Sequence, residues 1–275
     1  MAANSAHNGR HREGNKNARP EYHYKVVSRD SPELDNCRMI DSIDSSMAYH
    51  IGRPEVIGTS GTCLRYPYGG KSLDKLNLSM HLDYIRFLRG FVTIFEGVVH
   101  MNSLHFYHLD IKMSNITMTD DYVFRFIDFG ISGSNRIRTI FANVYVIWPY
   151  ETCLLARAPP QLADERTRLD TYVSDPYFKH YCPYTDESAI AERINDNYQK
   201  LKVLPMDERL DIIYNKIDIY SLAIVLDSII GILDLPERLA QALRGLCLAM
   251  MDFSTEHRCT AQWALRRYKT IINCM

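Results

Sequence analysis

The chain has 275 residues, of which 46% are hydrophobic and 24% charged, and its formal net charge is −1. These proportions are typical of a globular protein and exclude a largely disordered chain. The near-zero charge gives no electrostatic reason to expect nucleic acid or a membrane surface as the main partner. The 7 cysteines include no C-x-x-C pair, and the polar N-terminus is no signal peptide, so we expect a soluble protein in a reducing, intracellular compartment.

The first part of the chain combines a polar arm with short elements of mixed type. Residues 1–20 are rich in Asn, Gly, Arg and His and predict a disordered arm. Aromatic and β-branched residues at 22–28 predict a strand. Apolar residues at helical spacing predict a short helix over 33–47. Two further strands are expected at 55–58 and 63–66, because glycines between and after them can form turns.

From residue 80 onward the pattern is mostly helical. Apolar residues between Met80 and Met101 follow the 3.6-residue period and predict a long helix. Two short apolar runs on either side of Thr119–Asp121 predict a small β-hairpin. Later helices are expected at 186–203, 216–232, 236–251 and 260–272. The predicted fold class is therefore α+β, with a small β-containing part followed by a helical part.

The segment with the most chemical information is H-L-D-I-K-M-S-N at residues 108–115, followed by D-F-G at 128–130. Phosphoryl transfer needs a carboxylate that orients the attacking hydroxyl, a cation near the transferred phosphate, and oxygen ligands for Mg²⁺. The two segments flank the predicted hairpin, so their side chains can converge. The residues that supply these groups are Asp110, Lys112, Asn115 and Asp128.

An H-x-D-x-K-x-x-N run followed by D-F-G resembles the protein kinase family. The resemblance covers about residues 22–270. Other segments similar to the family are the hinge-like run at 64–73, the W-P-Y-E at 148–151 in place of A-P-E, the helix at 218–223, and the segment at 250–261. The compact first part is similar to divergent kinases of large DNA viruses, which would place the protein in the cytoplasm or nucleus of a host cell.

This resemblance implies a bilobal, kinase-like fold. Residues 21–68 would form a reduced β-containing N-lobe that ends at the hinge, and residues 69–275 a mostly helical C-lobe. Within the C-lobe, residues 128–151 would be the activation segment and residues 152–215 an insertion.

The resemblance also implies the roles of the motif residues. Asp110 would be the catalytic base, and Lys112 would contact the γ-phosphate of ATP, as in serine/threonine kinases. Asn115 and Asp128 would ligate Mg²⁺. The implied cofactors are therefore ATP and Mg²⁺, and the implied partner is a protein substrate.

Residues outside the motif would bind the nucleotide or hold the site. Tyr66 and Tyr68 lie in the hinge, whose backbone would hold the adenine. Glu151 and Arg258 would form a structural ion pair. Asp218 would accept backbone hydrogen bonds from the loop around His108.

The chain departs from the family pattern in its first part and in the catalytic loop. No G-x-G-x-x-G precedes the hinge. Lys25, in a strand-like context, matches the family's nucleotide-binding lysine, or is simply a strand lysine whose ammonium group reaches solvent. As its carboxylate partner we favour Glu33 over Asp35 and Asp41. Leu109 replaces an arginine that normally binds the phosphate of a phosphorylated activation loop. We therefore do not expect phosphorylation of that loop to regulate the activity of this chain.

The 152–215 segment is longer than the family needs. A connection of this length in a compact domain is usually functional or partly helical. A helical decoration that buries its tyrosines is the favoured interpretation, and docking of a partner is the alternative.

Three functions compete. The leading one is an ATP-dependent serine/threonine protein kinase. The second is a pseudokinase scaffold or nucleotide-binding regulatory module without turnover, which the missing glycine-rich loop favours. The third is a small-molecule kinase of the aminoglycoside or choline type, which the Glu151 and Arg258 features oppose.

Overall fold

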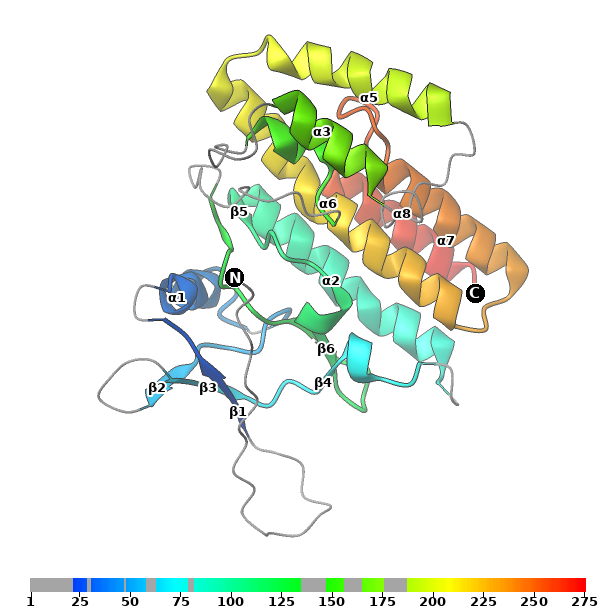
Figure 1. Ribbon diagram of the computed structural model, residues 1–275. Coiled ribbons are helices and arrows are strands. Elements are labelled where there is room, and N and C mark those ends of the chain that lie inside the picture. Colours follow the sequence, from blue (N-terminus) through cyan, green and yellow to red (C-terminus); the bar gives the residue numbers. More distant parts are fainter. Residues whose placement is uncertain are drawn as a thin grey trace.

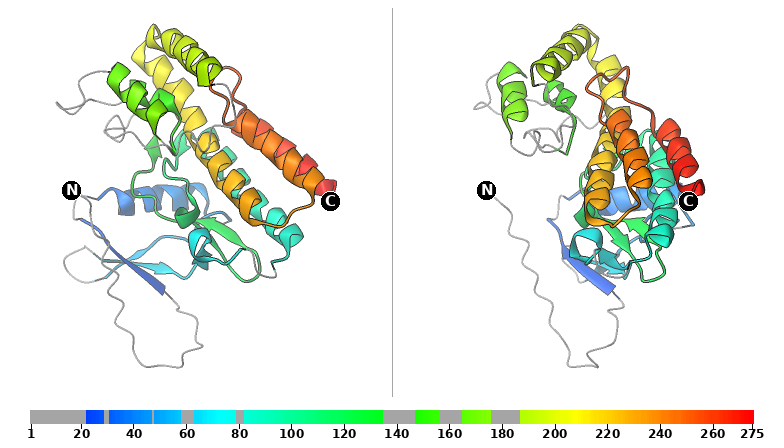
Figure 2. Two further views of the ribbon diagram at one scale, coloured as in Figure 1. Left: turned by 45° about the vertical axis from the view of Figure 1, so that its right-hand side comes forward. Right: turned by 90° about the vertical axis from the view of Figure 1, so that its right-hand side faces the viewer.

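The computed structural model describes residues 22–28, 31–46, 48–57, 63–78, 82–134, 147–155, 165–175 and 187–275. Over these residues the chain is an α+β protein. Two small three-stranded antiparallel sheets and helix α1 (Glu33–Ile43) lie on one side of the long helix α2 (Tyr84–Ser103), and most of the other helices lie on its opposite side (Figures 1 and 2). The predicted α+β class is therefore confirmed.

The first sheet has the strand order β1-β3-β2, with β1 at Tyr22–Val26, β2 at Glu55–Ile57 and β3 at Cys63–Pro67. Its register places Lys25 opposite Leu64. Helix α1, which follows β1, ends before the predicted position 47. The reason is Asp44, whose carboxylate accepts the backbone N–H of Tyr49 and the hydroxyl of Ser46 and so folds the chain into a turn.

The second sheet has the order β4-β6-β7, with β4 at Lys71–Ser72, β6 at Ile116–Met118 and β7 at Phe124–Phe126; the 3₁₀ turn η1 spans Leu73–Lys75. Strands β6 and β7 are the predicted hairpin. Its turn packs closely on α2, because a Cβ on Gly90 would lie 2.2 Å from the carbonyl oxygen of Tyr122. Residues 68–70 connect β3 of the first sheet to β4 of the second. A short two-stranded sheet pairs β5 (Phe106–Tyr107) with β8 (Gly133–Ser134).

The helices after residue 150 are η3 (Tyr150–Leu154), α3 (Glu165–Ser174), α5 (Glu187–Lys202), α6 (Met206–Ile232), α7 (Glu237–Met250) and α8 (Ala261–Asn273). Helix α6 begins ten residues earlier than predicted. Pro205 precedes it, and Asp207 and Glu208 in its first turn complement the helix dipole. Its middle, from Ile217 to Leu226, is buried on every side. No described helix has the length and apolar composition needed to cross a membrane.

Among the residues that the structure describes, two hydrophobic clusters form the core. The larger joins α1 and the sheets to α2, the later part of α6, α7 and α8. The smaller joins η3, α3, α5 and the start of α6 to Leu109 in the loop after β5. The 152–215 segment is thus partly helical, and Tyr172 is buried as expected. Its residues 156–164 and 176–186 lie outside the described residues, and docking of a partner there stays a prediction.

Candidate active site around Lys25, Asp110 and Asp128

The loop that carries Asp110 is fixed through the backbone of the two residues before it. Leu109 has φ 63°, in the left-handed region that a leucine rarely adopts. The N–H groups of His108 and Leu109 donate to the two carboxylate oxygens of Asp218, at 2.7 and 2.8 Å. Their carbonyls accept from the hydroxyl of Ser132, at 2.9 Å, and from the indole N–H of Trp148, at 2.6 Å. All four backbone polar groups are therefore satisfied, which offsets the strain.

The Asp110 carboxylate contacts two other motif residues. Lys112 Nζ lies 2.8 Å from its Oδ2 and 3.0 Å from its Oδ1. The amide nitrogen of Asn115, in the 3₁₀ turn η2 (Met113–Asn115), donates to the same Oδ2 at 2.8 Å and to the Asp110 carbonyl at 2.9 Å. Burial raises the pKa of Asp110, although Lys112 opposes this effect. The geometry therefore places a half-buried carboxylate beside an ammonium group.

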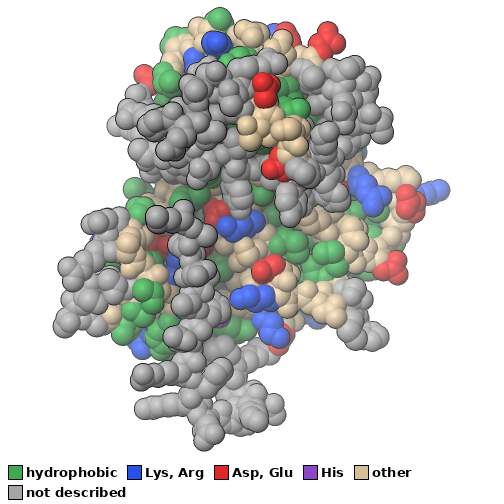
Figure 3. Space-filling model, in the orientation of Figure 1, with side chains coloured by type: hydrophobic (Ala, Val, Ile, Leu, Met, Phe, Trp, Pro, Cys, Tyr) green, Lys and Arg blue, Asp and Glu red, His purple; other side chains and the backbone are tan. Residues whose placement is uncertain are grey.

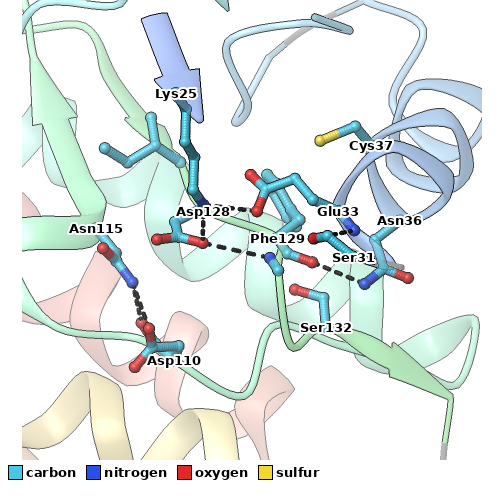
Figure 4. Close-up of polar contacts among 12 residues, drawn as sticks. Lys25, Ser31, Glu33, Asn36, Cys37, Asp110, Asn115, Asp128, Phe129 and Ser132 are labelled. Atoms are coloured by element: carbon cyan, nitrogen blue, oxygen red, sulfur yellow. Dashed lines mark hydrogen bonds and ion pairs between the residues drawn. The ribbon is translucent and has the colours of Figure 1, made fainter. Parts of the chain in front are cut away.

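Lys25 joins the first sheet to the D-F-G segment. Its Nζ lies 2.6 Å from Glu33 Oε2 and 2.7 Å from Asp128 Oδ1, as Figure 4 shows. The predicted choice of Glu33 as its partner is confirmed, and Lys25 does not point only at solvent. Burial alone would lower the pKa of Lys25, but the two carboxylates outweigh it, so the pKa lies above its ordinary value. Lys25 is charged.

The same attraction acts on Asp128. Burial alone would raise the pKa of its carboxyl group, but the Lys25 ammonium outweighs this and keeps the pKa below its ordinary value. Asp128 also has a left-handed backbone, with φ 65°. A non-glycine residue in this region is strained, and such strain is often found at functional sites.

Glu33 is also held by Tyr66, whose hydroxyl donates to Glu33 Oε1 at 2.6 Å. Tyr66 is buried, and its hydroxyl also lies 3.7 Å from the thiol of Cys37. The Tyr66 side chain therefore supports Glu33, and the expected role of the Tyr66 backbone at the adenine stays a prediction. Tyr68 is half-buried, and its ring centroid lies 5.0 Å from that of His23 on β1. This contact places the Tyr68 ring beside β1.

Helix α1 makes a second contact with the D-F-G segment. The Asn36 amide donates to the carbonyl of Phe129 at 2.7 Å. The glycine that follows has no room for a side chain, because a Cβ on Gly130 would lie 2.9 Å from Glu33 Oε2 and 3.2 Å from Asp128 Oδ1. Glycine at this position therefore lets α1 approach the Asp128 carboxylate.

His108 is a structural member of the site. Its Nε2 lies 3.1 Å from the carbonyl of Ile127, and its Nδ1 lies 3.3 Å from the backbone nitrogen of Asp110. These partners suit a neutral imidazole that donates from Nε2 and accepts at Nδ1. Burial lowers the pKa of His108 to about 4. His108 therefore braces the loop without charge at neutral pH.

The two residues expected to bind magnesium fit that ion only together with phosphates. Within the described residues, no three His, Cys, Asp or Glu side chains are placed to hold a metal ion by themselves. Mg²⁺ commonly binds one or two carboxylates plus substrate phosphates. Asp128 Oδ2 and Asn115 Oδ1 accept no hydrogen bond from the described part of the chain, since Lys25 binds Asp128 Oδ1 and Asn115 donates from its nitrogen. These two oxygens are available as ligands.

Glu151 and Arg258 form an ion pair that is sealed, meaning that solvent reaches neither side chain. Arg258 Nη2 lies 2.7 Å from Glu151 Oε1, and both side chains are 0% exposed. The Arg258 guanidinium also donates to the carbonyl of Asp252 at 2.8 Å and lies over the ring of Tyr220. The expected pairing of Glu151 with Arg258 is confirmed, as is the expected role of Asp218.

Several side-chain contacts that position the site were not predicted from the sequence. They are made by Asn36, Tyr66, Ser132 and Trp148, through the bonds given above. Asn36 could have been found from its position one helical turn after Glu33. The others have no signature in the sequence. Residues 135–146 of the expected activation segment and the arm at 1–20 lie outside the described residues.

Part of the site is open to solvent. Figure 3 shows Lys, Arg, Asp and Glu side chains gathered across the middle of one face, at the junction between the sheets and the helical part. Lys25 and Asp128 are each partly open, with side-chain exposures of 35% and 37%. The Lys25–Asp128 pair can therefore be reached by a ligand.

No protein-family model matches this sequence, and no curated protein is detectably similar to it. Any assignment of function therefore has to come from the residues of the site.

Proposed function

We propose that this chain is an ATP-dependent serine/threonine protein kinase. It transfers the γ-phosphate of ATP to a hydroxyl of a protein substrate. In this proposal the chain has the bilobal kinase arrangement, with residues 21–68 as a reduced N-lobe and residues 69–275 as the C-lobe. The nucleotide lies between them, beside residues 68–70.

One observation supports the proposal above the others. Lys25 binds Asp128 and Glu33 at once, although Asp128 is 103 residues away in sequence. Asp128 in turn lies in the same site as the Asp110–Asn115 pair (Figure 4). A strand lysine, a helix glutamate and two loop carboxylates thus gather where phosphoryl transfer would need them.

Each side chain then has a task. Lys25, held by Glu33, binds phosphate oxygens of ATP. Asp128 and Asn115 would hold Mg²⁺, which neutralises charge on the phosphates. Asp110 orients the substrate hydroxyl and accepts its proton, and Lys112 lies beside the transferred phosphate. Positioning and electrostatic stabilisation supply most of the rate in such reactions.

A nucleotide-binding scaffold without turnover is the second candidate. No G-x-G-x-x-G precedes the hinge-like segment, and the first sheet has three strands within the described residues. The contacts of Asp110 with Lys112 and Asn115 favour the enzyme, because a scaffold has no need for this arrangement.

Thermal unfolding with ATP alone, Mg²⁺ alone and both tests the proposal. A ligand that binds only the folded state raises the melting temperature. We expect the largest rise with both, and transfer of ³²P to a basic protein in the same sample. Asp128→Asn should abolish the rise, and the exposed control Asp234→Asn should keep it. A rise without transfer would support the scaffold, and neither rise nor transfer would contradict both.

A further inference from the structure

The peptide group that joins Leu109 to Asp110 is fixed at both of its ends. Its carbonyl oxygen accepts the indole N–H of Trp148 at 2.6 Å. Its N–H faces Nδ1 of His108 at 3.3 Å. A peptide group is planar, so these two bonds set the orientation of the plane from which the Asp110 side chain starts.

Trp148 is itself held by the 152–215 segment. The hydroxyl of Tyr172, on α3, donates to the Trp148 carbonyl at 2.7 Å. The same hydroxyl lies 3.2 Å from that of Tyr220 on α6. Tyr172 and Trp148 are both buried, and they share the smaller hydrophobic cluster with the Leu109 side chain. A continuous set of buried contacts therefore runs from α3 to the residue before Asp110.

The local strain explains why this support is needed. Leu109 has a left-handed backbone with φ 63°, and it lacks the freedom that a glycine would have there. Its side chain is fully buried beside Trp148 in the cluster, so it cannot reach a phosphate on another segment. The loop is thus held by packing and by the indole hydrogen bond.

We propose that Trp148 is a positioning residue that sets the orientation of the Asp110 carboxylate through the Leu109 carbonyl, and that Tyr172 of the 152–215 segment holds Trp148 in place. This inference rests on the proposed function, because it gives Asp110 a reacting role. It also gives the 152–215 segment a task at the site.

The test compares two substitutions that remove the same kind of bond. Trp148→Phe removes the indole N–H and keeps an aromatic ring in the cluster. Tyr268→Phe is the matched control, because the buried Tyr268 hydroxyl donates to the Leu88 carbonyl at 2.9 Å, between α8 and α2. Initial rates of ³²P transfer give kcat and the KM for ATP, and hydrogen exchange reports the backbone amides of His108, Leu109 and Asp110.

We expect Trp148→Phe to lower kcat by about 10- to 100-fold, since a misplacement of about 1 Å can cost that much. The KM for ATP should stay within about twofold, because Lys25 and Asp128 are untouched. Tyr268→Phe should keep kcat within about twofold. Equal kcat values for the two variants would overturn the proposal.

Two further arms keep the proposal testable if a variant or the enzyme fails. If Trp148→Phe does not fold, Tyr172→Phe takes its place. Tyr172→Phe should lower kcat by less than the 10- to 100-fold expected for Trp148→Phe, but by more than the Tyr268→Phe control does. Equal kcat values for Tyr172→Phe and that control would overturn the proposal. Should the wild type transfer no phosphate, the proposed function fails, and exchange decides the positioning role. Faster exchange of the Asp110 amide in Trp148→Phe but not in Tyr268→Phe supports it, and unchanged exchange overturns it.

Discussion

Two ion pairs of nearly equal length lie in different surroundings. Lys25 contacts Glu33 at 2.6 Å and Asp128 at 2.7 Å, and its side chain is 35% exposed. Arg258 contacts Glu151 at 2.7 Å, and neither side chain is exposed at all. The distances therefore do not distinguish the pairs, but their access to solvent does.

The difference in solvent exposure distinguishes a pair that a ligand can reach from a pair that only stabilises the fold. A ligand phosphate can compete for Lys25 because one side of the pair is open. No ligand can reach Arg258, whose guanidinium is fully buried and also contacts the Asp252 carbonyl and the Tyr220 ring. We therefore expect substitutions of the sealed pair to change stability, and substitutions of the open pair to change ligand binding.

The largest effect on stability is expected from Arg258→Met. The substitution leaves the Glu151 carboxylate buried without its partner, and breaking a buried pair in this way typically costs about 3–5 kcal/mol. Urea unfolding followed by circular dichroism measures the cost. A loss below about 1 kcal/mol, the range of a surface pair, would show that the pair is not sealed.

The titration of His108 tests whether its imidazole is buried as the structure shows. Burial lowers its pKa to about 4 from an ordinary 6.5, so between these values the unfolded chain binds a proton that the folded chain excludes. This contribution destabilises the fold as pH falls through the window, by about 3 kcal/mol in total. NMR titration of the imidazole should show it neutral at pH 5. A midpoint above pH 6 would contradict the assignment.

The free energy of unfolding itself should change little with pH over this window. Burial raises the pKa of Asp218 to about 6 from 3.8, so its contribution stabilises the fold as pH falls. The two shifts oppose each other. The His108 titration is therefore a sharper measurement than the pH dependence of unfolding.

Lys25→Met tests the open pair. Solvent reaches Lys25 and Asp128, but Glu33 is only 2% exposed and would keep the Tyr66 hydroxyl as a donor. We therefore expect a cost between the ~1 kcal/mol of a surface pair and the about 3–5 kcal/mol of a fully buried one. Binding should suffer more, because the variant loses the cation that we propose binds the ATP phosphates. The rise in melting temperature with Mg²⁺ and ATP should disappear, whereas the exposed control Lys75→Met should retain it. A normal rise in Lys25→Met would remove Lys25 from the nucleotide site.

The smallest effect is expected from an ion pair on the surface of the first sheet. Arg65 and Glu55 are paired across β2 and β3, and solvent reaches both side chains. Surface pairs contribute little to stability. Arg65→Ala should leave the unfolding midpoint unchanged within error, and a large shift would mean that this edge of the sheet is more buried than the structure shows.

The sequence predicted what depends on local pattern and on motif. The hairpin, helices α2, α7 and α8, the pairing of Lys25 with Glu33 and the pairing of Glu151 with Arg258 were expected and are present. These features carry periodic apolar residues or charged residues at recognisable positions.

Other features depend on contacts between distant segments, which one sequence does not reveal. Trp148 reaches the Leu109 carbonyl across 39 residues, and Tyr66 reaches Glu33 across 33. The early start of α6 was missed although Leu210, Ile213 and Tyr214 are buried apolar residues at helical spacing. This pattern was present in the sequence and would have predicted a longer helix.

The most direct measurement of the central claim is the rate of ³²P transfer from γ-labelled ATP to a protein substrate, with wild type and Asp110→Asn side by side. The account predicts label on serine or threonine from the wild type. It predicts a fall of about 10²–10⁴-fold in Asp110→Asn, with the Mg²⁺–ATP rise in melting temperature retained. Equal rates from the two proteins, or no transfer by a wild type that binds Mg²⁺–ATP, would contradict it.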